Sequence, residues 1–197
     1  SNDKSHTKLV YTETHEKVFY DSMQFLDATF GIAMGDPVED CLNVIVTSDG
    51  GNSWKKIPCE NLPKIVEGEA AFAASNTNLI IRGNSIFMVS GGKKSRCFVS
   101  VDKGNSWQVY ETPIIQGEAM TGIFTADFYD ENIGFIAGGN YENPSSNKQN
   151  KAITFDGGKT WKLVANGSGF GYASCIQFVP NSKGKSLICV GKTGIHY

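Results

Sequence analysis

The chain has 197 residues, of which 40% are hydrophobic and 19% charged, and its formal net charge is −2. This composition is typical of a turn-rich soluble fold and excludes a disordered chain. The chain has two arginines, Arg82 and Arg96, so we expect no surface for nucleic acid or anionic lipid. No apolar run approaches the roughly 20 residues that span a bilayer, so we expect no membrane insertion.

The five cysteines show no C-x-x-C spacing, and we expect most of them to be small buried hydrophobic residues. Cys175 and Cys189 could face each other across a hairpin, although we do not expect a disulfide there. The Ser1-Asn2 start is typical of a processed or engineered end. We therefore expect a periplasmic or secreted protein whose leader peptide is removed, while the cysteines leave the redox compartment open.

In chain order, the first predicted element is a strand over residues 8–12, which we interpret as the outer strand of a blade that begins earlier. Four repeats follow, each with an apolar strand A and an apolar strand B that ends in Gly. We predict A strands at 22–25, 70–73, 122–126 and 174–178, and B strands at 30–35, 86–91, 134–138 and 187–191. A third strand, C, is alternating or β-branched, as at 43–46 and 151–154. No stretch holds a helical period over the ~11 residues that a helix prediction needs.

An octapeptide of the form [S/T]-x-D-x-G-x-[S/T]-W follows three of the C strands, at 47–54, 100–107 and 154–161. Its Asp residues are 53 and 54 positions apart, which indicates a repeat architecture. The hydroxyl and carboxylate can accept backbone N–H bonds, the Gly takes a positive φ, and the Trp covers the turn. We predict a turn between strand C and a strand D, with the structural residues Asp49, Gly51, Trp54, Asp102, Gly104, Trp107, Asp156, Gly158 and Trp161.

Four short antiparallel strands per repeat of about 50 residues are typical of β-propeller blades. We expect an all-β propeller of about four blades, covering about 14–60, 66–113, 119–166 and 172–197, with 191–197 as a C strand running toward a fourth octapeptide. Two arrangements stay open. Either the first strand closes the last blade of a four-bladed ring, or the chain is an arc of a larger propeller. We favour the arc, whose open edges would invite pairing with another copy.

The octapeptides match the Asp-box, or bacterial neuraminidase repeat, of sialidases, sortilin-type receptors and several glycoside hydrolases, and this match indicates a fold rather than a function. A second resemblance covers nearly the whole chain. The stretches 34–37, 68–75, 122–124, 138–141 and 190–194 resemble a bacterial family related to photosystem II stability/assembly factors, whose members are often labelled "oxidoreductase" without a redox motif. The resemblance implies a seven-bladed propeller in the intact protein and a binding or assembly role. Arg96 also matches the family's pattern, whereas Asn140 stands where the family usually has Asp and Ala173 where it usually has Arg.

Blade topology predicts which loops share a face. The octapeptides, as C–D turns, share one face with the A–B turns, whereas the B–C and D–A loops lie on the opposite face. Charged and aromatic residues gather in the B–C and D–A loops, on the face where propellers usually bind. The candidates for ligand binding are therefore Asp36, Glu69, Arg96, Glu118, Asn140, Tyr141 and Tyr172. For Glu69 and Glu118, which stand in repeat-equivalent Gly-Glu-Ala triplets, a buried structural role is the leading alternative.

Catalytic chemistry is poorly supported by these residues. A sialidase needs three arginines around its substrate's carboxylate, and this chain has two. Hydrolysis of a polysaccharide by an enzyme of the xyloglucanase type would need two carboxylates about 5 to 9 Å apart, which Asp36 with Glu69 or Glu118 could supply.

Cofactor chemistry has no motif in the sequence. No G-x-G-x-x-G lies between a strand and a helix, so a dinucleotide is not expected. The histidines His6, His15 and His196 are scattered near the chain ends, so neither a metal site nor a catalytic triad is expected. We therefore predict a non-catalytic binding or assembly module with an unidentified protein or glycan partner, and keep polysaccharide hydrolysis as the alternative.

Overall fold

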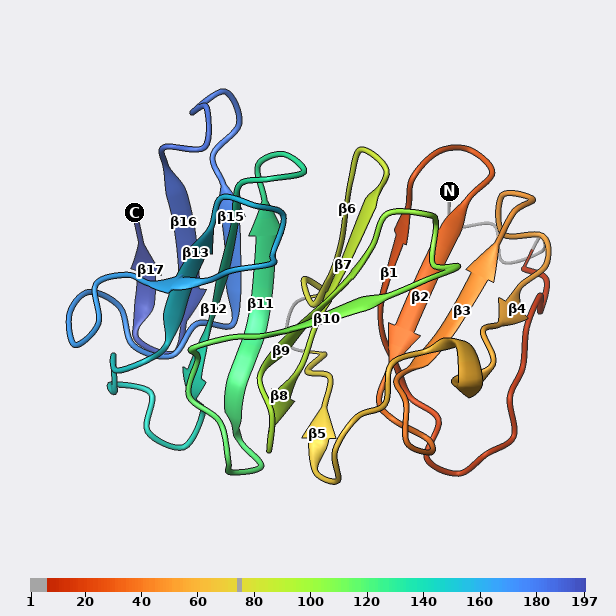
Figure 1. Ribbon diagram of the computed structural model, residues 1–197, viewed down its shortest axis with the longest axis horizontal. Coiled ribbons are helices and arrows are strands. Elements are labelled where there is room, and N and C mark those ends of the chain that lie inside the picture. Colours follow the sequence, from red (N-terminus) through yellow and green to blue (C-terminus); the bar gives the residue numbers. More distant parts are fainter. Residues whose placement is uncertain (1–6, 74–75) are drawn as a thin grey trace.

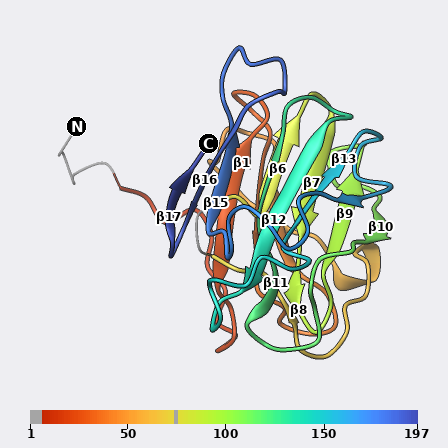
Figure 2. The same ribbon diagram turned by 90° about the vertical axis from the view of Figure 1, so that its left-hand side faces the viewer.

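The computed structural model describes residues 7–73 and 76–197, and these residues form short antiparallel strands. Figure 1 shows the strands grouped into successive sheets along the longest axis of the molecule, from β1–β4 at one end to β15–β17 at the other. Figure 2 looks along this series from its C-terminal end, with β15–β17 nearest the viewer. The fold is an all-β propeller architecture built of four-stranded antiparallel blades, as predicted.

Blades 1 and 2 each contain four consecutive strands that pair with their neighbours. Blade 1 consists of β1 (Tyr20–Phe25), β2 (Gly31–Gly35), β3 (Asn43–Thr47) and β4 (Lys55–Lys56). Blade 2 consists of β6 (Leu79–Arg82), β7 (Ser85–Val89), β9 (Arg96–Ser100) and β10 (Gln108–Glu111). A short 3₁₀ turn, η2 (Cys59–Asn61), follows β4.

Blade 3 is extended at its inner edge by two short strands, which gives the order β14-β13-β12-β11-β8-β5. Its own strands are β11 (Thr121–Phe128), β12 (Gly134–Asn140), β13 (Lys151–Thr154) and β14 (Lys162–Leu163). The added strands are β5 (Glu69–Ala70) and β8 (Gly91–Gly92). Among the described residues blade 4 has three strands, β15 (Cys175–Phe178), β16 (Leu187–Gly191) and β17 (Gly194–His196).

Two predicted strands differ from the structure. The A strand of the second repeat is β6 (Leu79–Arg82), whereas the prediction placed it at 70–73. Leu79–Arg82 pairs with β7 across a tight turn, while Ala70 pairs with Gly91 at the edge of blade 3. The strand predicted at 8–12 is not formed, because this segment has no strand partner in the structure. His6 and the end of the 68–75 stretch lie outside the described residues.

Adjacent blades are held together by three apolar clusters. The first joins blades 1 and 2, with Ile32, Met34, Val44, Leu79, Met88 and Phe98 in its centre. The second joins blades 2 and 3 around Phe87, Val99, Ile123, Phe128 and Ile136, and the third joins blades 3 and 4 around Ala137, Ala173, Ile176 and Cys189. Each fully buried large side chain contributes about 1.5–3 kcal/mol, so the blade interfaces supply much of the stability.

The three octapeptides adopt one hydrogen-bonded turn. In the second copy, Asp102 accepts bonds from Ser106 N–H (2.9 Å), Ser106 Oγ (2.6 Å) and Ser100 Oγ (2.9 Å). Gly104 N–H donates to Ser100 Oγ at 2.8 Å, and Gly104 has a φ of +83°. The equivalent bonds recur around Asp49 and Asp156 with nearly the same lengths. The side-chain hydrogen bonds of the turn therefore come from within its own eight residues.

Loop contacts define the two faces of the molecule. Gly50 N–H donates to Thr29 O at 2.9 Å and Gly157 N–H to Asn132 O at 3.0 Å, so octapeptides and A–B turns lie together on what we call the turn face. On the opposite side, B–C and D–A loops bond to each other, as in Thr112 N–H to Ser95 O and Tyr172 N–H to Pro144 O. We call this side the loop face. No helix of the described chain is long and apolar enough to cross a membrane.

Candidate functional site

An ion pair between Glu69 and Arg96 lies buried on the loop face. Arg96 donates through Nη2 to Glu69 Oε2 (2.5 Å) and through Nε to Oε1 (3.0 Å). Ser90 Oγ donates to Glu69 Oε1 at 2.5 Å and Val66 N–H to Oε2 at 3.1 Å. The Glu69 side chain is fully buried, and that of Arg96 is 12% exposed. Both carboxylate oxygens of Glu69 are thus engaged in holding two loops together.

Asp36, which follows β2, lies near a second carboxyl that sequence reasoning missed. Asp21 occupies a bulge in the β1–β2 pairing, where Tyr20 pairs with Gly35 and Ser22 with Met34. Its Oδ2 is buried and has no hydrogen-bond partner among the described residues. Burial, and then the negative charge of Asp36, raise the pKa of Asp21 to about 7. Asp21 lies just before the strand predicted at 22–25 and inside the observed β1.

Burial also raises the pKa of Asp36, although an N–H bond from Ala71 at 3.2 Å opposes the shift. The two carboxyls line different cavities. Asp36 lines a cavity of about 550 Å³ on the loop face, together with Lys17, Glu39, Asp40, Glu67 and Glu69. Asp21 lines one of about 660 Å³ beside the free face of blade 1.

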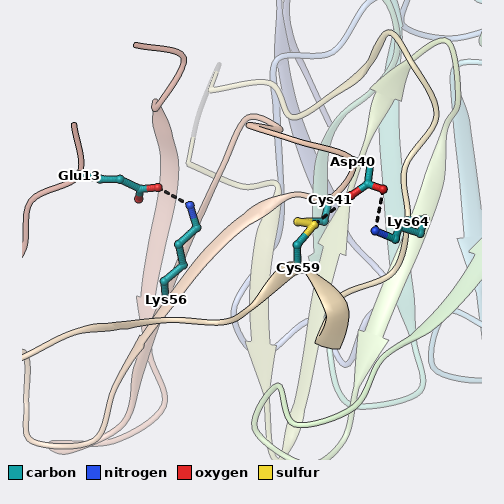
Figure 3. The surroundings of a disulfide bond; sticks show 6 residues. All are labelled: Glu13, Asp40, Cys41, Lys56, Cys59 and Lys64. Atoms are coloured by element: carbon teal, nitrogen blue, oxygen red, sulfur yellow. Dashed lines mark hydrogen bonds and ion pairs between the residues drawn. A yellow bond between two sulfur atoms is a disulfide. The ribbon is translucent and has the colours of Figure 1, made fainter. Parts of the chain in front are cut away.

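A disulfide between Cys41 and Cys59, which the sequence did not predict, joins the B–C loop of blade 1 to η2. Figure 3 shows it beside the Lys64–Asp40 ion pair (2.6 Å), with the Glu13–Lys56 pair nearby. Cys97, Cys175 and Cys189 are free, so no bond joins the last two. The signal was topological, since Cys41 lies in a B–C loop and Cys59 follows strand D, which places both on one face.

One set of potential metal ligands groups Glu39, Asp40 and Cys59 within the described residues. The sulfur of Cys59 is bonded to Cys41, and both carboxylates are exposed. The set therefore does not offer the deprotonated thiol that a bound transition metal would use.

Aromatic rings form a connected group on the loop face. Phe72 stacks on Phe124, with ring centroids 3.9 Å apart, and Phe124 contacts the edge of Tyr172 at 4.8 Å. Tyr172 in turn meets Tyr141 at 5.4 Å, and the Lys192 ammonium lies 3.3 Å from the Tyr141 ring centroid. Tyr172 is buried, whereas Tyr141 is 39% exposed. We call these five residues the aromatic line.

The remaining predicted candidates are separate from the Glu69–Arg96 pair. Glu118 is exposed, and its backbone rather than its carboxylate contacts Thr121. The Asn140 side chain accepts bonds from the N–H groups of Glu142 and Asn143, so it shapes the loop that carries Tyr141. The Gly-Glu-Ala triplets thus have unlike environments, with one Glu buried and the other in solvent.

Together, the blades and loops define a β-propeller with a buried ion pair and a connected group of aromatic rings on its loop face. No family model matches the chain, and no curated protein matches it. Solved propeller structures do match.

A structure of YCF48 bound to a D1 peptide has a TM-score of 0.58 and 17% identity, covering 88% of this chain and 47% of the other. A GH74 enzyme from Niastella koreensis has a TM-score of 0.58 and 12% identity, covering 87% and 26% of the two chains. An ancestral GH74 enzyme has a TM-score of 0.55 and 16% identity, covering 86% and 21%. The chain thus spans about half of the YCF48 chain and about a quarter or less of the GH74 enzymes. At these identities the likeness shows the fold.

Proposed function

We propose that this chain is a non-catalytic binding or assembly module that holds an extended segment of a partner protein across its loop face. The observation that carries the proposal is the continuity of the aromatic line. Asp36, on blade 1, accepts a bond from Ala71, the neighbour of Phe72. From Phe72 the ring contacts continue through Phe124 on blade 3 to Lys192 on blade 4. Phe124 and Tyr172 are buried, whereas Phe72, Tyr141 and Lys192 reach the surface. A ligand that contacts surface groups from the Asp36 end of this series to Lys192 on blade 4 would have to be extended rather than compact.

The chemistry of the aromatic line suits a polypeptide. Aromatic faces bind apolar and proline side chains, and tyrosine adds a hydroxyl for hydrogen bonding. Tyr141 and Lys192 are both exposed, and the Lys192 charge could pair with an acidic group of the ligand. The carboxylates around Asp36, at the other end, favour a basic group. These opposite charges would set the direction of the bound segment.

The role of Glu69 also favours binding over catalysis. A catalytic carboxylate must reach its substrate, whereas Glu69 is buried and bonded to Arg96, Ser90 and Val66. The likeness to YCF48 bound to a D1 peptide offers a precedent for a peptide ligand on this fold. We further propose that the repeated turns are Asp-boxes and that the chain is related to the bacterial photosystem II assembly-factor-like proteins, with its blades part of a larger ring. The shared turn geometry and this likeness support both ideas.

The test compares two tyrosines of equal exposure on opposite faces. Tyr141 is 39% exposed on the loop face, and Tyr129 is 40% exposed at an A–B turn. A displayed library of unstructured peptides is selected on the chain, and a selected fluorescent peptide is titrated by anisotropy. We expect Tyr141→Ala to weaken binding about tenfold or more and Tyr129→Ala to leave it unchanged. Failure to select any peptide, or equal effects of both variants, would count against the proposal.

The alternative is hydrolysis of a polysaccharide, which the likeness to GH74 enzymes favours, as does the raised pKa of Asp36 in a cavity that other carboxylates line. An acid with a raised pKa beside a second carboxyl is the arrangement that glycosidases use. The same cavity could also bind a glycan without hydrolysing it. Turnover of a polysaccharide that Asp36→Asn abolishes would replace the binding-only proposal.

We also propose a periplasmic or secreted location, since disulfides persist in oxidising compartments and Cys41 pairs with Cys59. Mass spectrometry of the protein from its native source would test this, because a chain with both cysteines reduced would contradict it.

A further inference from the structure

A cavity of about 480 Å³ opens on the turn face between blades 2 and 3. Its walls come from the A–B turns of both blades, from β9 and β10 of blade 2, and from the second and third octapeptides. Blade 2 also packs on blade 1 and blade 3 on blade 4, so the cavity lies inside the series of blades (Figure 1). Its volume is within the range of ~300–1,000 Å³ that is usual for small-molecule sites.

The repeats explain how the cavity arises. Because β2 and β7 pair with the next strand in the same register relative to the octapeptide, Ser85 of blade 2 is equivalent to Phe30 of blade 1. The fourth octapeptide position is Lys103 in blade 2 and Gly157 in blade 3. Between blades 1 and 2, the Lys103 ammonium lies 5.4 Å from the centre of the Phe30 ring, so two large side chains meet there. Between blades 2 and 3 the equivalent residues are Ser85 and Gly157, and both line the cavity.

The residues that line the cavity include polar side chains that the fold leaves without partners. Tyr110 Oη donates to Gln108 Oε1, and the amide NH2 of Gln108 has no partner among the described residues. The side-chain amides of Asn84 and Asn132 likewise form no hydrogen bond within the part of the chain that the structure describes. Glu131 Oε1 accepts a bond from Asn84 N–H at 2.9 Å, which leaves Oε2 to accept another. Because an amide both donates and accepts, this lining can bond groups that do the same.

One wall of the cavity is apolar. Val99 and Val101 are two positions apart at the end of β9, so both side chains fall on the same side, and both residues line the cavity. Gln108 pairs with Val99 across β9 and β10, which places its amide beside this wall. The cavity therefore combines an apolar surface with hydrogen-bonding groups at its edge.

The charges of the lining nearly cancel. The charged residues that line the cavity are Glu131, Asp156 and Lys159. The Asp156 carboxylate accepts three bonds from Thr154 and Thr160 of its own octapeptide, so it is already occupied. One carboxylate and one ammonium remain, and this balance favours a neutral ligand over an ion.

We infer that this cavity binds a sugar unit of a neutral glycan. A sugar ring carries hydroxyl groups that each donate and accept hydrogen bonds, while its C–H groups form an apolar face. The amides of Asn84, Gln108 and Asn132 suit the hydroxyls, and the wall of Val99 and Val101 suits the C–H groups. The site lies on the turn face, away from the loop face where a partner segment is proposed to bind, so the chain can hold both ligands at once.

An array of immobilised oligosaccharides tests the inference. The array holds neutral gluco-, galacto- and manno-oligosaccharides together with sialylated and sulfated ones. We expect the chain to bind a neutral member, and the neutral member with the strongest signal is then titrated by calorimetry. Gln108→Ala and Asn132→Ala should each weaken its binding about tenfold, because each removes hydrogen bonds to hydroxyl groups. The matched control is Gln177→Ala, at an exposed glutamine of β15 in blade 4, and it should leave the affinity unchanged.

Ser85→Phe adds a steric test, because it introduces the residue that blade 1 has at the equivalent position. Filling the cavity in this way should abolish binding, and circular dichroism checks that the variant folds. Gln108 and Asn132 are exposed, so their variants keep the test decisive if Ser85→Phe does not fold.

Three results of the array and the titrations would overturn the inference directly. These are no binding to any neutral member, binding to charged members only, or the same affinity in the wild type and in both amide variants. A glycan whose affinity falls in Asp36→Asn and not in Gln108→Ala would also overturn it, because that glycan would lie on the loop face.

Discussion

The two faces of this molecule are built in different ways. On the turn face, the Asp carboxylate of each octapeptide is bonded from within the same eight residues, as Asp102 is by Ser100 and Ser106. On the loop face, the main contacts join distant segments, as Glu69 does with Arg96, 27 positions away. The octapeptides are thus stabilised locally and alike in each blade, while bonds such as Arg82 to Asp127 join blades on the same face. The contacts of the loop face differ from blade to blade.

The largest effect is expected where the loop face depends on a buried charge. Glu69→Gln should lower the free energy of unfolding by about 3–5 kcal/mol, because it leaves Arg96 buried without its counter-charge. Urea unfolding measures the change. The repeat-equivalent Glu118→Gln, at an exposed position, should stay within about 0.5 kcal/mol. If both variants lowered the free energy of unfolding equally, the buried Glu69 would not stabilise the fold more than the exposed Glu118.

Next in size is the disulfide that joins two loops of the same face. Reduction of Cys41–Cys59, which are 18 residues apart, should lower the free energy of unfolding by about 3 kcal/mol through loop-closure entropy. Unfolding with and without a phosphine reductant gives the value. A Cys41→Ala/Cys59→Ala variant is the control and should not respond to the reductant. An equal response in both proteins would assign the effect to another cysteine.

A smaller loss is expected on the turn face. Gly104→Ala should cost about 1–2 kcal/mol, because its φ of +83° is unfavourable for any residue with a Cβ. Thermal unfolding measures it, with the exposed Val101→Ala of the same octapeptide as the control. If the two variants unfold alike, the positive φ is not what makes this turn depend on Gly.

An effect of similar size to that of Gly104→Ala depends on pH. The folded pKa of Asp21, about 7, lies above its ordinary value of 3.8, so the folded state holds this proton more tightly. Stability should therefore fall as pH rises from about 4 through 7, by about 1–2 kcal/mol for a partly solvated group. Asp21→Asn should flatten the unfolding profile over this range. A profile that keeps its slope in the variant would show that another group titrates.

Features that depend on local sequence could be predicted, whereas features that depend on contacts between distant segments could not. Octapeptides, blade strands and the two faces could be predicted, because turn chemistry and strand alternation are local. The second A strand was misplaced because two apolar runs, 70–73 and 79–82, compete, and pairing with β7 favours Leu79–Arg82.

The candidate site was predicted only in part. The face and Tyr141 followed from topology, whereas the contacts of Phe72 with Phe124 and of Cys41 with Cys59 depend on how blades pack. Asp21 was missed since a bulge, which no local pattern marks, sets its position.

The central claim, that the loop face is the binding face, is tested most directly by hydrogen–deuterium exchange with and without a selected peptide. The account predicts protection at 69–72, 121–125, 140–143 and 190–193, which surround the aromatic line, and unchanged exchange in the octapeptides 47–54, 100–107 and 154–161. Protection confined to the octapeptides, with none around Tyr141, would contradict it.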